Sequence, residues 1–194
     1  MNIAVLALQG AFIEHIQMLK SLGVDTTEIR KKSDFNQNFD GLILSGGEST
    51  VMGKLLHDLD LFEDMKIAIE GGLPVFGTCA GLILLAKNID NQSKNHLATM
   101  DVTVQRNAFG RQCASFSTTH PFHGQQIEMR FIRGPYISDV KTNVTILSEY
   151  QGKIVAVRQG NQLGVAFHPE LTKDTTVHNY FLDMIKSSHV AAES

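Results

Sequence analysis

The sequence is poor in several residue types, and each shortage excludes a class of protein. It has two cysteines, Cys79 and Cys113, and no tryptophan in 194 residues. Two cysteines are too few for a disulfide framework or a cysteine-rich metal site. No apolar run approaches the roughly 20 residues that a membrane-spanning helix needs. The first residues lack a basic leader and enter an apolar strand at once, which is not the pattern of a signal peptide.

Charge is scarce as well. Charged residues make up 19% of the chain, the net charge is -3, and lysine and arginine form no block. Such a chain has no positive electrostatic field that would attract nucleic acid, so we expect neither a nucleic acid nor a membrane as its partner. The hydrophobic share of 43% is that of an ordinary globular protein. Low cysteine content fits a reducing cytoplasm, which a thiol nucleophile would need.

The first half of the chain alternates short apolar strands with amphipathic helices. This alternation predicts a parallel sheet covered by helices on both faces. The hydrophobic periodicity and the turn residues give the expected bounds. Strands are expected at residues 2–8, 24–30, 41–44 and 73–76, and helices at 12–22, 51–56, 61–70 and 80–87.

The second half has a different pattern. Between residues 97 and 167 apolar and polar side chains alternate, which is typical of antiparallel strands, and we expect these strands to extend the sheet. A closing helix is expected at 174–186. The length of the chain predicts a single α/β domain, which we place at residues 1–188, with a frayed tail at 189–194.

Cys79 is the first candidate for chemistry. It lies at the centre of Gly77-Thr78-Cys79-Ala80-Gly81, between an apolar strand and an apolar helix. Small residues around a reactive side chain at such a turn are typical of a nucleophile elbow, here with sulfur in place of the serine oxygen. The N-terminal N–H groups of the helix favour the thiolate, which is the form that attacks carbon. The alternative is an inert buried cysteine, which holds unless the chain supplies a base.

His168 is the candidate base. It follows an expected strand at 162–167, and Glu170 lies two residues further along, beyond Pro169. Proline pushes the residue before it into an extended conformation, and side chains two residues apart on an extended chain point the same way. The carboxylate can therefore hold one imidazole nitrogen while the other faces the sulfur. Cys79, His168 and Glu170 are accordingly predicted to form a nucleophile, base and orienting group.

Further residues complete the candidate site. A thiolate that attacks a carbonyl needs backbone donors for the oxyanion, and Ala80 N–H and the Gly46-Gly47 pair are the candidates. Arg106 and Arg133 could grip a carboxylate, although surface arginines often do nothing specific. His120 and His123 have no acidic or cysteine partner nearby, so we expect a solvated loop there rather than a metal site. Cys113 is interpreted as a small apolar filler.

Six motifs follow one another along nearly the whole chain. They are Leu8-Gln9-Gly10-Ala11, Gly46-Gly47-Glu48-Ser49-Thr50, Gly77-Thr78-Cys79-Ala80-Gly81, Arg106-Asn107-x-Phe109-Gly110-Arg111-Gln112, Phe131-Ile132-Arg133 and His168-Pro169-Glu170-Leu171-Thr172. Together they resemble the motifs of the triad (class I) glutamine amidotransferases. More narrowly, they resemble the glutaminase subunits of pyridoxal 5′-phosphate synthase. The second and fourth motifs are the most specific to these subunits.

The resemblance implies a fold, a reaction and a set of roles. The fold would be a flavodoxin-like three-layer domain with a mixed, mainly parallel open sheet and antiparallel strands in the C-terminal half. The reaction would be hydrolysis of L-glutamine without cofactor or metal, with the ammonia passed to a (β/α)₈ synthase subunit in a hetero-oligomer. The implied site comprises the catalytic residues Cys79, His168 and Glu170, the glutamine-binding residues Gly47, Glu48, Ser49, Arg106, Ile132 and Arg133, and the oxyanion-hole residues Gly47 and Ala80.

Some residues depart from the family pattern, and other interpretations stay open. Ser45 replaces a common proline, Phe12-Ile13 a common Val-Arg pair, and Gly134 and Tyr136 flank Pro135 where Ala-Pro-His is frequent. The rival interpretations are a glutaminase subunit of another amidotransferase such as imidazole glycerol phosphate synthase, a cysteine peptidase or hydrolase, and a non-catalytic regulatory subunit.

Overall fold

A computed structural model describes residues 1–107 and 115–194. The rest of the fourth motif, from Phe109 to Gln112, lies outside the described residues, as does Cys113. Within the described ranges, no helix combines the length and the apolarity that a bilayer crossing demands.

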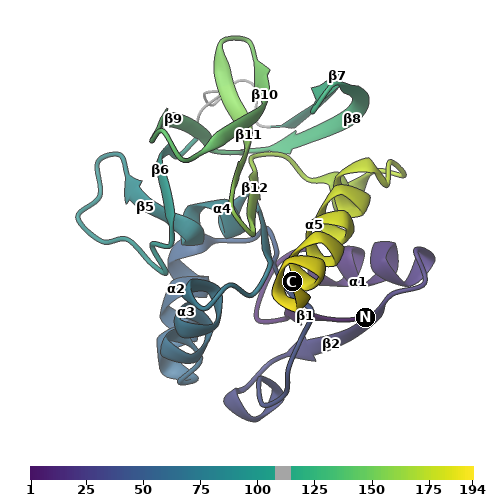
Figure 1. Ribbon diagram of the computed structural model, residues 1–194. Coiled ribbons are helices and arrows are strands. Elements are labelled where there is room, and N and C mark those ends of the chain that lie inside the picture. The colour runs from purple at the N-terminus through teal and green to yellow at the C-terminus, as the bar shows by residue number, and fades with distance from the viewer. Residues whose placement is uncertain (108–114) are drawn as a thin grey trace.

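The centre of the fold is a mixed sheet whose first part is parallel (Figure 1). Buried residues, most of them apolar, form its inner strands, whereas the edge strand, Asp25–Ile29, is mostly polar, and every neighbouring pair in this part runs parallel. In spatial order these strands are β2 (Asp25–Ile29), β1 (Asn2–Leu6), β3 (Gly41–Leu44), β4 (Val75–Thr78) and β12 (Gln162–Val165). The last strand of the chain therefore lies beside β4, which leads into Cys79.

The sheet continues beyond β12 with the strands of the C-terminal half. β12 pairs antiparallel with β11, β11 with β9, and β9 with β6, whereas β6 and β5 are parallel. Their bounds are β11 (Lys153–Gln159), β9 (Tyr136–Val140), β6 (Met100–Gln105) and β5 (Ala86–Ile89), and β10 (Thr145–Tyr150) pairs with β11. A separate two-stranded sheet consists of β7 (Ser115–Phe122) and β8 (Gln125–Ile132).

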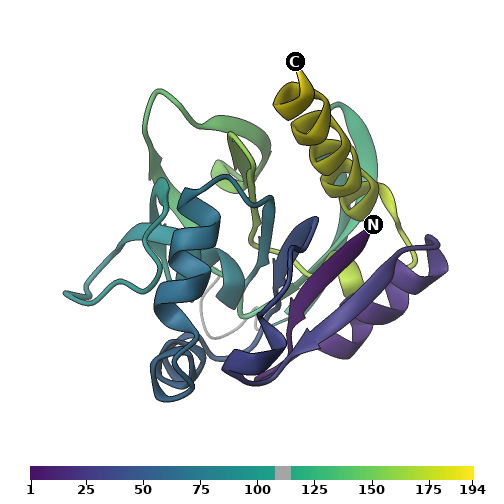
Figure 2. The same cartoon turned by 60° about the horizontal axis from the view of Figure 1, so that its bottom comes forward.

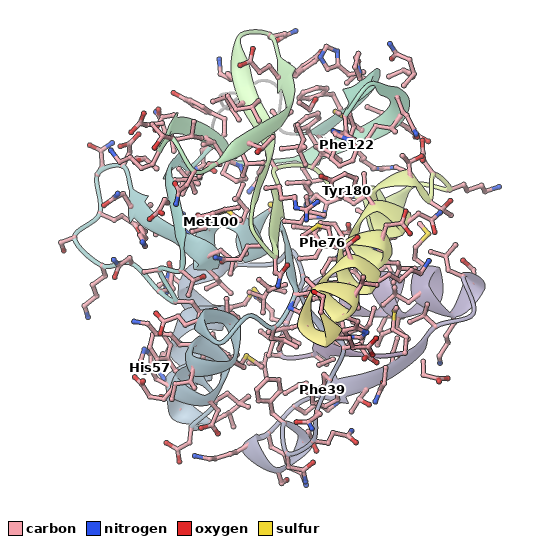
Figure 3. The ribbon with its side chains drawn as sticks, in the orientation of Figure 1. Phe39, His57, Phe76, Met100, Phe122 and Tyr180 are labelled. Carbon is pink, nitrogen blue, oxygen red and sulfur yellow. The ribbon has the colours of Figure 1, made fainter. Side chains whose placement is uncertain are left out.

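Helices cover the two faces of the parallel part, as Figures 1 and 2 show. On one face lie α1 (Phe12–Ser21) and α5 (Thr176–Glu193), and on the other α2 (Ser49–Asp58), α3 (Phe62–Glu70) and the short α4 (Ala80–Leu85). Two 3₁₀ turns, Lys32–Asp34 and Pro169–Leu171, lie in the connections. Phe76 of β4 lies beneath α5 in Figure 3, with its ring 5.5 Å from that of Phe181. The predicted α/β architecture with added antiparallel strands is confirmed.

The observed bounds of β1, β2, β3, β4 and β12 lie within two residues of those expected, and three further details of the prediction are wrong. The helix after Cys79 ends at Leu85, not at residue 87, because Ala86 begins β5 and pairs with Met100. The closing helix begins at Thr176 and continues past residue 186 to Glu193, through the alanines that favour a helix. The stretch with His120 is part of β7 rather than a loop, and its ring lies edge-on to Tyr150 at 5.3 Å.

Glycines let α4 approach the sheet closely at the turn that carries Cys79. A Cβ on Gly81 would lie 2.0 Å from the carbonyl oxygen of Leu44 in β3, and one on Gly77 would lie 2.6 Å from the backbone of Gly81. Both obstacles are backbone atoms, which cannot move aside as a flexible side chain can. The N-terminus of α4 therefore reaches its position only with glycine at these positions.

We expect Gly81→Ala to lower the free energy of unfolding by about 2–3 kcal/mol, because the added methyl group overpacks the α4–β3 contact. Alanine normally stabilises a helix relative to glycine, so the sign of the change is diagnostic. The matched control is Gly53→Ala in α2, where the three atoms nearest to the new Cβ all belong to the side chain of His96. Urea unfolding monitored by circular dichroism measures both. Equal stability of the two variants would contradict the close packing of α4.

Candidate active site

Cys79 occupies a strained turn between β4 and α4. Its backbone has φ 52° and ψ −104°, a conformation that residues with a side chain rarely adopt. Its N–H donates to the carbonyl of Val165 in β12 at 2.9 Å, and its Sγ lies 4.0 Å from the carbonyl oxygen of Ile132. This turn directs the sulfur away from the sheet into a cavity that Cys79 helps to line. The geometry is that of the predicted nucleophile elbow.

His168 and Glu170 lie together at the end of β12. The imidazole Nδ1 of His168 is 2.6 Å from Oε1 of Glu170, and both side chains are buried. The His168 N–H donates to the carbonyl of Arg130 at 2.7 Å, which fixes the backbone beside β8. A Cβ on Gly46 would lie 2.4 Å from Cε1 of His168, so glycine at 46 leaves the space that the ring occupies. The structure thus brings the predicted base and its carboxylate into contact.

The electrostatic environment of His168 favours the imidazolium. Burial lowers the pKa of His168, but hydrogen bonds with Cys79 and then Glu170, together with the negative charges of both, raise it to about 10. An imidazole flanked by a thiol sulfur and a carboxylate is therefore protonated at neutral pH. Such a ring can hold a negative charge on the sulfur and has a proton ready for a leaving group.

Cys79 lies in the wall of a cavity of about 740 Å³. All six residues predicted to bind substrate line it, and so do Cys79 and His168. Ala80 does not line it, although its N–H is at the start of α4, where a helix leaves its first N–H groups free. Glu170 lies behind His168, away from the cavity. The lining residues are Gly10, Ala11, Gly46, Gly47, Glu48, Ser49, Cys79, Ile83, Gln92, Arg106, Asn107, Ile132, Arg133, Pro135, His168 and Leu171.

Arg106 and Glu48 form a charged wall of this cavity. Arg106 Nη2 lies 3.0 Å from Oε1 of Glu48 and also donates to the hydroxyl of Ser49. The Glu48 carboxylate caps α2, accepting from the N–H groups of Thr50 at 3.1 Å and Val51 at 2.8 Å. Partial burial raises the pKa of Glu48, but these backbone donors and Arg106 outweigh it and leave the pKa lowered. The two side chains therefore present one positive and one negative charge side by side.

The loop before α1 supports the glycine pair. The Ala11 N–H donates to the carbonyl of Gly46 at 3.1 Å, and the side-chain oxygen of Gln9 accepts from the Glu48 N–H at 2.7 Å. Gly10 has φ 83°, and a Cβ there would lie 1.7 Å from the Gly46 oxygen, so only glycine fits. Ser45, which departs from the family pattern, donates to the carbonyl of Gln9 at 3.3 Å. The first and second motifs thus form one unit.

Sequence reasoning missed several residues of the site. Gly10 and Ala11 belong to a motif that carries the resemblance but no reactive side chain, whereas Gln92 lies in a polar connection with no recognisable pattern. A further miss is His15, a buried histidine on the apolar stripe of α1. A polar side chain between apolar positions of a helix was the signal that could have found it. In the ranges 1–107 and 115–194, no three histidine, cysteine, aspartate or glutamate residues could hold a metal ion.

We expect the His168 ring to stay protonated between about pH 6 and pH 9 in the free chain, well above the ordinary histidine range. Cys79→Ala removes a hydrogen bond and a negative charge that stabilise the imidazolium, so the pKa of His168 should fall toward its ordinary value. Nitrogen-15 NMR of the imidazoles measures this, with His57 outside the cavity as reference. A ring that loses its proton near pH 6.5 in both chains would contradict the pairing.

Comparison with known proteins finds relatives that match nearly the whole chain. Residues 5–187 match the SNO glutamine amidotransferase family. The chain is 59% identical to the pyridoxal 5′-phosphate synthase subunit PdxT of Methanocorpusculum labreanum over 190 residues, which is 97% of this chain and 100% of that protein. It is 53% identical to the PdxT subunit of Haemophilus influenzae, with 96% and 99% covered.

Solved structures show the same fold. A crystal structure of a glutamine amidotransferase superposes with a TM-score of 0.90 at 41% identity, covering 95% of this chain and 98% of that one. A putative GMP synthase component of Thermoplasma acidophilum has a TM-score of 0.70 at 18% identity, covering 100% and 98%, and this likeness shows the fold alone. The family match and the identities establish that this chain belongs to the SNO glutamine amidotransferase family.

Proposed function

We propose that the chain is the glutaminase subunit of a pyridoxal 5′-phosphate synthase, in which Cys79, His168 and Glu170 carry out the hydrolysis of L-glutamine. The observation that carries the proposal is the 2.6 Å contact of Glu170 with the imidazole of His168, which lines the same cavity as the elbow cysteine, in a chain of this family. The rival amidotransferases are not favoured, because the relatives that share more than half of their residues with this chain are pyridoxal 5′-phosphate synthase subunits.

In the first half of the reaction, the Cys79 sulfur attacks the side-chain amide carbon of glutamine. The negative charge moves from sulfur to the amide oxygen, where the N–H groups of Gly47 and Ala80 are proposed to receive it. The imidazolium of His168 then gives its proton to the amide nitrogen as the carbon–nitrogen bond breaks. Ammonia leaves, and the product is a glutamyl thioester on Cys79 with a neutral His168.

The second half uses the change in charge that the first half produced. An acylated sulfur is uncharged, so two of the influences that raise the pKa of His168 are lost, and only those of Glu170 oppose burial. The neutral ring then accepts a proton from water, whose oxygen attacks the thioester carbonyl. The carbon–sulfur bond then breaks, and its electron pair returns to the sulfur. The new carboxyl group gives its remaining proton to solvent, glutamate leaves, and His168 is an imidazolium again. One residue thus serves as acid and then as base.

The cavity offers charges for the amino acid end of glutamine. We assign Arg106 to the α-carboxylate, because a guanidinium forms paired hydrogen bonds with a carboxylate. Glu48 beside it has the charge that suits the α-ammonium group, and Ser49 and the Ile132-Arg133 segment complete the walls. A zwitterionic ligand therefore meets an adjacent pair of opposite charges, while its amide extends toward Cys79.

The ammonia needs an acceptor, and the relatives are named as subunits of a synthase. We propose that the acceptor is a (β/α)₈ synthase subunit, joined to this chain in a hetero-oligomer. We place both in the cytoplasm, because a nucleophilic thiol is kept reduced there. Neither nucleic acid nor membrane has a part in this proposal.

Cys79→Ala should abolish ammonia release from glutamine in the presence of the synthase subunit, with a loss of roughly 10⁴-fold or more because the covalent step disappears. Circular dichroism and co-purification with the synthase subunit control for folding and docking. Full glutaminase activity in this variant would refute the assignment of the nucleophile.

Arg106→Gln should raise the KM for glutamine about tenfold or more, because a charged hydrogen bond to the substrate is lost, and should lower kcat far less. The control is Arg30→Gln, which removes an exposed arginine that pairs with Glu28 outside the cavity. Steady-state kinetics of glutamate formation separate the two constants. A loss confined to kcat would assign Arg106 to the reaction rather than to substrate binding.

A further inference from the structure

Two buried histidines lie behind the carboxylate of Glu170, one from α1 and one from α5. Oε1 of Glu170 contacts His168, while Oε2 lies 3.5 Å from Nε2 of His15. The other nitrogen of His15, Nδ1, lies 2.9 Å from Nε2 of His178. Nε2 of His15 is also 3.1 Å from the hydroxyl of Thr78, the residue that precedes Cys79. All three residues of the row Glu170, His15, His178 are buried, and the two histidines have no exposed surface.

The two ends of this row share an unusual property. In the described part of the chain, two buried side-chain polar atoms have no hydrogen-bond partner, and they are Oε2 of Glu170 and Nδ1 of His178. Buried polar groups are normally paired, so each exception requires an explanation. Both atoms belong to one row of contacts. The positions of the imidazole protons therefore decide how much free energy each unpaired atom costs.

Both rings are neutral at physiological pH. Burial holds the pKa of His15 well below its usual value, helped by the charges of His178 and His168, and burial lowers the pKa of His178 to about 4. Each ring therefore carries one N–H. The contact of His15 with Glu170 is thus one between a neutral imidazole and a carboxylate, not an ion pair.

Two proton arrangements satisfy the contact between the rings. If His15 donates from Nδ1, its Nε2 turns a lone pair toward the carboxylate, and Nδ1 of His178 becomes a buried N–H without an acceptor. If His178 donates from Nε2, His15 directs its Nε2–H at Oε2 of Glu170 and at Thr78, and Nδ1 of His178 is merely an unused acceptor. Orphaned buried N–H groups are rarer than unused acceptors. The second arrangement also places a positive dipole end beside the negative charge.

We propose that His15 is a positioning residue for the reaction: its Nε2–H, held in that tautomer by the Nε2–H of His178, orients the Glu170 carboxylate toward His168. This inference rests on the proposed role of Glu170 in the triad. The Nε2–H of His15 holds Oε2 of Glu170, whereas His168 contacts Oε1. Through Thr78 the same N–H also contacts the strand end that carries the nucleophile. Neither histidine touches the cavity, so both act through Glu170.

The first experiment reads the proton positions in the unmodified chain, without any assay of activity. Nitrogen-15 NMR of the imidazoles at neutral pH distinguishes protonated from unprotonated ring nitrogens. The expected result is protonated Nε2 with unprotonated Nδ1 in both His15 and His178. A proton on Nδ1 of His15 would overturn the proposal.

The second experiment is a double-mutant cycle on glutamine hydrolysis with the synthase subunit present. His15→Leu should lower kcat about tenfold with KM changed less than about twofold, the size expected for losing a hydrogen bond to a charged group. In a Glu170→Gln background the same substitution should cost nothing further. His15→Gln, whose amide nitrogen can replace Nε2–H, should recover much of the rate. His57→Leu, on the exposed side of α2, is the control for removing a histidine elsewhere.

The outcomes separate the role of His15 from the role of the triad. Equal losses from His15→Leu in both backgrounds would overturn the positioning role and leave the triad intact. A Glu170→Gln variant with the unmodified rate would overturn the proposed triad and the role of His15 with it. If His15→Leu yields little folded protein, His15→Gln and the proton positions in the unmodified chain still decide.

Discussion

The site depends on backbone segments that touch without side chains between them. Gly81 lets α4 lie against the Leu44 carbonyl, Gly46 leaves room for the His168 ring, and Gly10 lets the first loop reach Gly46. These contacts hold the ends of β1, β3 and β4 and the His168 loop at one edge of the sheet. The chemistry that follows is possible because the polypeptide approaches itself this closely. A Cβ at any of these three positions would clash with the backbone or with the His168 ring.

The ionisable side chains of the site lie in successive layers, from the cavity into the interior of the protein. The cavity side holds Cys79 and the imidazolium of His168, and Glu170 lies one layer deeper. Behind Glu170 lie the two neutral histidines, His15 of α1 and His178 of α5, rather than another cation. The Glu170 carboxylate thus lies between the imidazolium of His168 and the neutral ring of His15. The imidazolium therefore remains responsive to the state of the sulfur.

Much of this could be predicted from the sequence. Gly77 to Gly81 and His168 to Glu170 have local patterns that state both residue type and geometry, so the elbow and the base–carboxylate contact were predictable. The helix end at Leu85 was not, because Ala86 continues an apolar run and only its pairing with Met100 makes it a strand. The contact of His15 with His178 spans 163 positions, and no local pattern encodes it. Contacts of that kind depend on which helices share a face of the sheet.

The place of β12 in the sheet has a consequence for how the protein is made. It is the last strand in sequence, yet it lies in the interior between β4 and β11, and it leads directly to His168. During synthesis Cys79 leaves the ribosome long before the strand that must insert beside it. A nascent or truncated chain would display a thiol with no base, and its central strands would have an open edge. The base and the missing interior strand of the sheet thus become available together, once β12 and the residues that follow it have been synthesised.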